Sequence, residues 1–144
     1  MLEALAARGL KRTPQRLALI RELADDPSHP TAMELYERLR AAMPTMSFAT
    51  VYNTLSALCE QGLCMARALE PGPVRFDPNV EPHDHAVCDA CGRVIDISQT
   101  GSSPSGVAVT GFAVRSVERI YRGRCVGCAA PAEHAAVAEH TTGD

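Results

Sequence analysis

Two C-x-x-C motifs carry the residue types of a metal site. Cys88 and Cys91 form the first motif, and Cys125 and Cys128 repeat its spacing after an interval of 33 residues. Each motif predicts a tight turn whose two sulfur atoms point the same way, so two such turns can close one tetrahedron around zinc. We therefore expect these four thiolates to hold a structural zinc ion.

Three other interpretations of these cysteines fit less well: disulfides, a redox pair and simple burial. A disulfide framework is typical of small secreted chains, whereas the first residues here lack the pattern of a signal peptide. A redox-active pair sits where a strand meets a helix, but the first motif lies between two runs with strand character. The other two cysteines, Cys59 and Cys64, are interpreted as small buried hydrophobic side chains with no assigned chemistry.

Two histidines precede the first motif and suggest a second metal ion. Residues i and i+2 of a strand project to the same face, so His83 and His85 can bind one ion together. Because the cysteines are committed to zinc, this ion would be a different one, with Asp96 on the neighbouring strand as an oxygen ligand. A nitrogen and oxygen site suits iron(II), manganese(II) or zinc. A solvated histidine pair is the simpler alternative.

The composition allows one ordinary domain or two small ones in 144 residues. The net charge of -3 does not favour a nucleic-acid ligand, but the charge is uneven along the chain. Basic residues gather near the N-terminus: Arg8, Lys11, Arg12, Arg16 and Arg21. Such a cluster is the minimum for contacts with DNA phosphates, although a basic stretch is more often just a solvated face. No apolar run is long enough to span a membrane, so we expect a soluble, cytoplasmic protein.

Four helices are expected in the first 62 residues. Thr13 and Pro14 mark the start of the second, Thr31 and Glu34 make a capping box for the third, and Gly62 ends the fourth. The expected ranges are 2–7, 14–26, 32–42 and 48–61. The buried stripes of the second and fourth helices are expected to comprise Leu17, Ile20 and Leu23 or Ala24, and Phe48, Val51, Leu55 and Leu58.

The fourth helix also presents a face suited to DNA. That face carries small polar groups and one aromatic ring, which can enter a major groove without charge repulsion: Ala49, Thr50, Tyr52, Asn53 and Ser56. Ordinary polar surface is the alternative. A hairpin over residues 64–69 and 74–77 is predicted next, because Pro71 and Gly72 give a strong turn signal. Helices followed by such a β-wing make a winged helix-turn-helix.

The second half of the chain is predicted to be a separate, strand-rich domain. Two prolines in residues 77–82 indicate a hinge, and strands are expected over 86–87, 94–97 and 112–121. The loop that follows residue 97 is flexible by composition. The expected domains are a winged-helix domain with its hinge (1–79), a metal-binding dimerisation domain (80–128) and a disordered tail (129–144).

The chain resembles the Fur family of metal-dependent repressors over nearly its whole length. Four motifs carry the resemblance: Arg12-Thr13-Pro14-Gln15-Arg16, His29-Pro30-Thr31-Ala32, Ala49-Thr50-Val51-Tyr52-Asn53 and Cys125-Val126-Gly127-Cys128. The resemblance implies an α+β fold, with an N-terminal winged helix-turn-helix domain followed by a small α/β zinc-containing dimerisation domain. It also implies a transcriptional repressor, not an enzyme, that binds a palindromic operator in double-stranded DNA as a homodimer.

The resemblance also assigns residues. It implies structural zinc on Cys88, Cys91, Cys125 and Cys128, and regulatory iron(II) or manganese(II) on His29, Asp77, His83, His85 and Asp96. One regulatory ion would then draw ligands from both halves of the chain and favour one arrangement of them. DNA contacts are expected from Lys11, Arg12, Arg16, Ala49, Thr50, Tyr52 and Asn53.

Two residues favour the peroxide-sensing PerR branch of the family. Asp96 stands where Fur-type members usually carry glutamate, and Asn53 where they often place arginine. Residues 98–110 show no helical stripe for the family's dimerisation helix, which resembles shortened actinobacterial FurA-like regulators. We therefore expect a peroxide-sensing repressor. The alternatives are a plain metal-uptake regulator, a small non-heme metalloenzyme built on His83, His85 and Asp96, and a zinc-ribbon module that binds protein.

Overall fold

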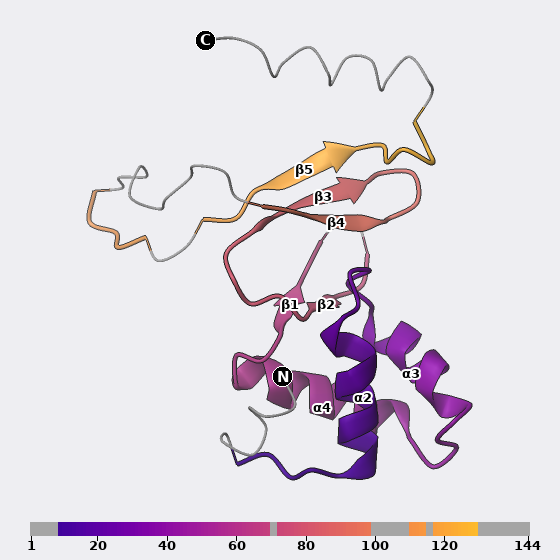
Figure 1. Ribbon diagram of the computed structural model, residues 1–144. Helices are drawn as coiled ribbons and strands as arrows, with labels where there is room; N and C mark the ends of the chain where they lie inside the picture. The colour runs from indigo at the N-terminus through magenta and orange to yellow at the C-terminus, as the bar shows by residue number, and fades with distance from the viewer. Residues whose placement is uncertain (1–8, 70–71, 99–109, 115–116, 130–144) are drawn as a thin grey trace. The chain divides into compact units, whose positions relative to one another are not determined.

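The computed structural model describes residues 9–69, 72–98, 110–114 and 117–129 (Figure 1). The chain divides into two compact units, Met1–Glu81 and Pro82–Asp144. The predicted boundary at residue 79 lies two residues before this division. The helix predicted over 2–7 lies outside the described residues, as do most of the loop 98–110 and nearly all of the tail 129–144.

The first unit contains three described helices, each started by a hydroxyl side chain. The helices are α2 (Pro14–Ala24), α3 (Ala32–Arg40) and α4 (Phe48–Glu60). The side-chain oxygens of Thr13, Thr31 and Ser47 accept the backbone N–H three residues further on, which satisfies one of the unpaired donors at each helix start. At α3 the Glu34 carboxylate also accepts the Thr31 N–H, so the predicted capping box is present.

The core of the first unit lies where the three helices meet. Its fully buried side chains include Leu19, Ile20 and Leu23 of α2, Leu35 of α3, and Val51, Leu55 and Leu58 of α4. Burial of each such side chain contributes about 1.5–3 kcal/mol. Two predicted core residues differ. Leu17 is only partly buried, whereas Leu19 is buried in the core. Phe48 is 39% exposed, and its ring packs edge-on against Tyr36, with ring centroids 6.0 Å apart.

The wing is shorter than predicted. Strands β1 (Met65–Arg67) and β2 (Arg75–Asp77) pair antiparallel, with Met65 opposite Asp77. A backbone bridge between Thr31 and Arg75 and a hydrogen bond from the Phe76 N–H to the Pro30 carbonyl join β2 to the segment before α3. The segment that contains His29 is therefore held against the wing.

The second unit is built on a three-stranded sheet. Strand β3 (Asp84–Cys88) lies in the centre, antiparallel to β4 (Val94–Ile97) and parallel to β5 (Ile120–Gly123) (Figure 1). The prediction of a strand over 112–121 is wrong in its extent, since β5 begins only at Ile120. The Arg119 N–H donates to the Asp84 carboxylate instead of to a strand carbonyl, which accounts for the late start. The described part of this unit contains no helix.

Among the described residues, no helix has both the length and the apolar character needed to cross a membrane.

Candidate metal centres

The four cysteines of the two C-x-x-C motifs lie together in the second unit. Their sulfur atoms all fall within 4.8 Å of one another, and the Cys91 and Cys125 sulfurs are 3.7 Å apart. A zinc ion with four bonds of about 2.3 Å to sulfur would place the sulfurs about 3.8 Å apart. The cluster therefore has the dimensions of a closed tetrahedral zinc site.

The pairing of β3 with β5 brings the two motifs together. Cys88 ends β3 and lies opposite Gly123 near the end of β5, just before Cys125. A backbone hydrogen bond closes a turn at each motif. The Gly92 N–H donates to the Cys88 carbonyl, and the Cys128 N–H donates to the Cys125 carbonyl, both at 2.8 Å. Gly92 has φ of 69°, a conformation that glycine adopts without steric cost.

The electrostatics of the cluster favour a cation. The Cys125 N–H donates to the Cys88 sulfur at 3.3 Å, and this lowers the pKa of Cys88 to about 6. In contrast, hydrogen bonding to the Cys125 and Cys91 side chains raises the pKa of Cys128 to about 12. Four sulfurs this close cannot all carry negative charge without a positive ion between them, which fits Zn²⁺.

A second group of donors lies in the same unit. His83 directly precedes β3 and His85 lies within it, and their Nε2 atoms are 3.0 Å apart. Asp96 lies opposite His85 in the β3–β4 register, and its Oδ1 is 3.5 Å from His83 Nε2 and 3.8 Å from His85 Nε2. Two imidazole nitrogens and one carboxylate oxygen thus converge on one point, as the His-x-His spacing predicts. This donor set fits iron(II), manganese(II) or zinc.

A carboxylate that sequence reasoning missed lies behind this group. Glu118 Oε1 is 3.0 Å from Nδ1 of His85, whose side chain is fully buried. A carboxylate this close favours a proton on Nδ1 through its charge, which leaves the lone pair of Nε2 facing His83 and Asp96. Glu118 lies 33 residues after His85, and it falls within a range predicted to be strand, so no local spacing marks it.

The remaining two predicted regulatory ligands lie in the first unit. His29 and Asp77 are both buried, and His29 Nε2 is 3.7 Å from Asp77 Oδ1. His29 has φ of 53°, an uncommon left-handed conformation. Such a conformation costs energy and persists only where the surrounding structure imposes it. Arg75 supplies part of that constraint by donating to the His29 carbonyl at 3.0 Å. Each unit therefore prepares its own share of the predicted regulatory ligands.

The predicted DNA contacts all lie in the first unit. Ala49, Tyr52 and Asn53 project from α4 as exposed side chains, and the Tyr52 side chain is 51% exposed. Thr50 is half-buried, and its hydroxyl lies 2.9 Å from that of Ser47. Lys11 and Arg12 are exposed in the segment before α2. Arg16 in the first turn of α2 donates to the Lys11 carbonyl at 3.0 Å, which ties this segment to the helix.

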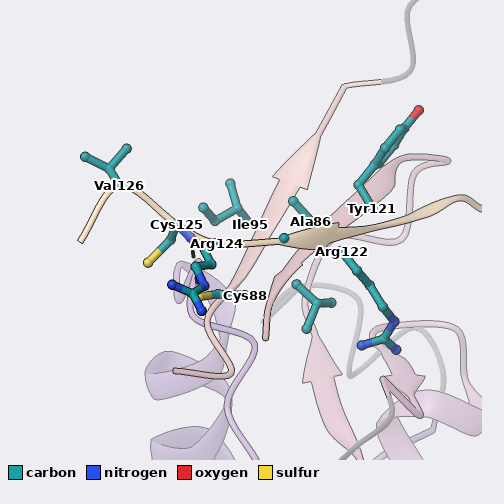
Figure 2. A pocket seen from close by; sticks show the side chains of 10 residues that line it. Ala86, Cys88, Ile95, Tyr121, Arg122, Arg124, Cys125 and Val126 are labelled. Carbon is teal, nitrogen blue, oxygen red and sulfur yellow. Dashed lines mark hydrogen bonds between the residues drawn. The ribbon is translucent and has the colours of Figure 1, made fainter. Parts of the chain in front are cut away.

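A cavity of about 410 Å³ opens on the sheet of the second unit next to the zinc cluster (Figure 2). It is lined by apolar atoms of Ala86, Ile95 and Tyr121, with Cys88 and Cys125 at its border. The Ile95 and Tyr121 side chains are 45% and 47% exposed. Apolar side chains are thus exposed on this face of the sheet, next to the four cysteines.

Comparison with known proteins shows which protein family the chain is related to. The family model described as "Ferric uptake regulator family" matches residues 7–118. The peroxide operon regulator of Bacillus subtilis (strain 168) is 35% identical over 136 residues, which cover 92% of this chain and 94% of that protein.

Two solved structures show the same fold. A zinc-bound manganese uptake regulator is 27% identical, with a TM-score of 0.67 over 86% of this chain and 97% of that one. The Vibrio cholerae ferric uptake regulator is 29% identical, with a TM-score of 0.65 over 85% and 98%. The predicted fold, a winged-helix domain with a small dimerisation domain, is thereby confirmed, and the metalloenzyme alternative is excluded. The chain belongs to the ferric uptake regulator family of transcriptional regulators.

Proposed function

We propose that the protein is a metal-dependent repressor that responds to peroxide. The observation that carries this proposal is the separation of its donors into two chemically different sets, one of four thiolates and one of imidazoles and carboxylates. A closed thiolate site suits a permanent structural ion, whereas a nitrogen and oxygen site suits an exchangeable one. The 35% identity to a peroxide operon regulator supports peroxide as the signal.

Zinc would be held by Cys88, Cys91, Cys125 and Cys128. The regulatory ion, iron(II) or manganese(II), would be held by His29, Asp77, His83, His85 and Asp96. Three of these ligands converge in the second unit and two lie together in the first, which supports their assignment. An ion bound by both sets would favour one arrangement of the winged-helix domain (1–79) and the metal-binding domain (80–128), and so would control DNA affinity.

The proposed DNA target is a palindromic operator bound by a homodimer. One short recognition helix reads few base pairs, so two copies on two half-sites are needed for useful specificity. The exposed face of α4 would enter the major groove, while Lys11, Arg12 and Arg16 contact phosphates. The apolar face of the sheet around Ile95 and Tyr121 is the proposed surface for the second copy. The cytoplasm, where an operator is accessible, is the proposed location.

Bound iron(II) would supply the one-electron chemistry that splits hydrogen peroxide beside its own ligands. The imidazole rings of His29 and His83 would meet the oxidant first, and a ring that gains an oxygen atom binds metal poorly. The zinc thiolates should react more slowly because a closed four-coordinate site has no open position. Peroxide would thus release the iron-loaded repressor from DNA but leave the manganese-loaded repressor bound.

A gel shift with operator DNA, combined with mass spectrometry, tests this proposal. We expect binding only with metal present, loss of binding after mild peroxide in the iron-loaded protein, and one added oxygen on His29 or His83. Manganese-loaded protein is the matched control and should keep its histidines without added oxygen and its binding to DNA. Intact histidines with DNA still bound would instead identify a plain metal-uptake regulator. No DNA binding either with or without metal would favour a zinc-ribbon module that binds protein.

A further inference from the structure

Two cysteines outside both metal sets lie in contact in the first unit. The sulfur atoms of Cys59 and Cys64 are 2.8 Å apart, closer than the 3.7 Å between Cys91 and Cys125 in the zinc cluster. A disulfide bond is about 2.05 Å long, so less than about 1 Å of movement would join them. The sequence predicts both as small hydrophobic side chains without chemistry, but their contact places the two thiols in position to react with each other.

The end of α4 sets this contact. Cys59 lies in the last turn of the helix, and the chain then reverses through Gly62, whose φ is 63°. The Gly62 N–H donates to the Cys59 carbonyl, and the Leu63 N–H donates to the Leu58 carbonyl, both at 2.9 Å. This helix-ending turn returns the chain against the helix, so that Cys64 faces Cys59 just before β1 begins.

The two thiols have different environments. Cys59 is partly exposed, whereas Cys64 is fully buried and its thiol also lies 3.9 Å from the Leu55 carbonyl. The Cys64 thiol lowers the pKa of Cys59, while the same hydrogen bond and burial raise the pKa of Cys64. An accessible sulfur with thiolate character beside a protonated, buried one matches the division between an attacking and a resolving cysteine.

We propose that Cys59 and Cys64 form a peroxide-reactive dithiol that closes to a disulfide between the recognition helix and the wing. The Cys59 thiolate attacks hydrogen peroxide, forming a sulfur–oxygen bond as the oxygen–oxygen bond breaks and hydroxide leaves. The Cys64 sulfur then attacks that sulfenic acid, and its proton leaves with the hydroxyl group as water. Two thiols and one peroxide give one disulfide and two waters, so the sulfurs lose the two electrons that the peroxide gains.

This site is independent of the regulatory metal, so it can be tested without iron. Zinc-replete, manganese-loaded full-length protein is treated with increasing hydrogen peroxide, denatured with a chelator and an alkylating reagent, and digested with trypsin. Both cysteines fall in one peptide, residues 41–67, whereas the zinc cysteines fall in residues 76–93 and 125–144. We expect the 41–67 peptide to lose two hydrogens and to carry no alkyl group. This should occur at peroxide doses that leave the peptides with the zinc cysteines fully alkylated.

Single variants distinguish the two roles. In Cys64→Ser, Cys59 should accumulate as a sulfenic acid that dimedone traps, and in Cys59→Ser the peptide should stay unoxidised at its remaining cysteine. Closure should also raise the Tm of the wild type, because a cross-link restricts the unfolded chain, and a thiol reductant should reverse the rise. Full alkylation of the 41–67 peptide at peroxide doses that already oxidise the zinc thiolates would overturn the proposal. Equal trapping of sulfenic acid by dimedone in Cys64→Ser and Cys59→Ser would also overturn it.

Discussion

The carboxylate behind His85 controls how that side chain presents itself to a cation. The charge of Glu118, 3.0 Å from Nδ1, favours a proton on the nitrogen that faces away from His83 and Asp96. A neutral imidazole without this partner would exchange between two tautomers, and only one of them can ligate through Nε2. The affinity of the regulatory site therefore depends on a residue that need not touch the ion.

We predict that Glu118→Ala weakens Mn²⁺ binding by about 10–100-fold, the usual effect of removing a carboxylate behind a ligating histidine. Calorimetric titration of zinc-replete protein with Mn²⁺ measures the affinity, and elemental analysis checks that zinc content is unchanged. Glu37→Ala, at an exposed position of α3, is the matched control. Equal affinity of the two variants would show that Glu118 has no such role.

At the scale of single residues, the sequence predicted which metal-donor side chains lie together better than it predicted the contacts that support them. The cysteine and histidine pairs are recognisable because turns and strands convert one- and two-residue spacings directly into geometry. Glu118 and the Cys59–Cys64 contact were missed for different reasons. The first depends on a parallel strand pairing across a long crossover, and the second on a left-handed glycine that reverses the chain after α4. Neither follows from residue types alone.

Among the secondary-structure elements, α4 and the segment before α2 carry different parts of the proposed DNA-binding surface. Lys11 is a flexible cation in that segment, whereas Tyr52 is an exposed ring in the middle of α4 that lies 6.3 Å from the Phe48 ring. A cation on a phosphate releases counterions, but an aromatic ring in the groove does not. Salt dependence can therefore separate their contributions.

We expect both Lys11→Ala and Tyr52→Ala to weaken operator binding without changing metal content. Lys11→Ala should also lower the slope of log K against log salt by about 1.8 for the dimer, about 0.9 for each of its two lost phosphate contacts, while Tyr52→Ala leaves the slope unchanged. Fluorescence anisotropy at several salt concentrations measures both. Arg93→Ala removes an exposed cation of the second unit and serves as control. Wild-type affinity in both variants would place the DNA surface elsewhere.

An ion pair between the end of α2 and α3 makes the first unit sensitive to acid. Partial burial raises the pKa of Asp26, but hydrogen bonds from Ser28 and the Arg38 guanidinium outweigh it and hold this pKa below its usual value. A lowered pKa contributes stability that is present above the unfolded value of 3.8 and is lost as pH falls through the folded value.

Asp26→Asn should therefore lower the stability of the protein at neutral pH, and this difference from wild type should vanish progressively below about pH 4. Urea unfolding followed by circular dichroism at a series of pH values provides the measurement. Asp25→Asn, one residue earlier and exposed, controls for the general loss of a carboxylate. A constant difference down to pH 2 would rule out the ion pair as its cause.

In the molecule as a whole, the two units depend on different sources of stability. The first has a core of apolar helix faces, which sequence periodicity predicted apart from shifts of one or two positions. The second is a small sheet whose outer strands carry exposed apolar side chains, so zinc must supply much of its folding free energy. The prolines of residues 77–82 predict a hinge from the sequence, whereas the late start of β5 depends on a tertiary contact of Arg119.

Replacing Cys128 by serine should unfold the second unit and abolish dimer formation, because zinc binding at such sites contributes about 10–16 kcal/mol to folding. The helical signal of the first unit should remain. Zinc analysis, circular dichroism and light scattering together test this. Cys59→Ser makes the same chemical change outside the cluster and should retain zinc and the dimer. A zinc-free Cys128→Ser dimer would contradict the structural role.

The order of the zinc ligands along the chain also determines when the second unit can form during synthesis. Cys88 and Cys128 are separated by 40 positions. At about 5–20 residues per second, a ribosome needs roughly 2–8 s to pass from one to the other. During that interval β4 and β5 are made while the site still lacks its fourth thiolate, and the helical unit is already complete. A cell short of zinc would thus accumulate full-length chains with a folded helical unit and four free thiols in an unfolded second unit.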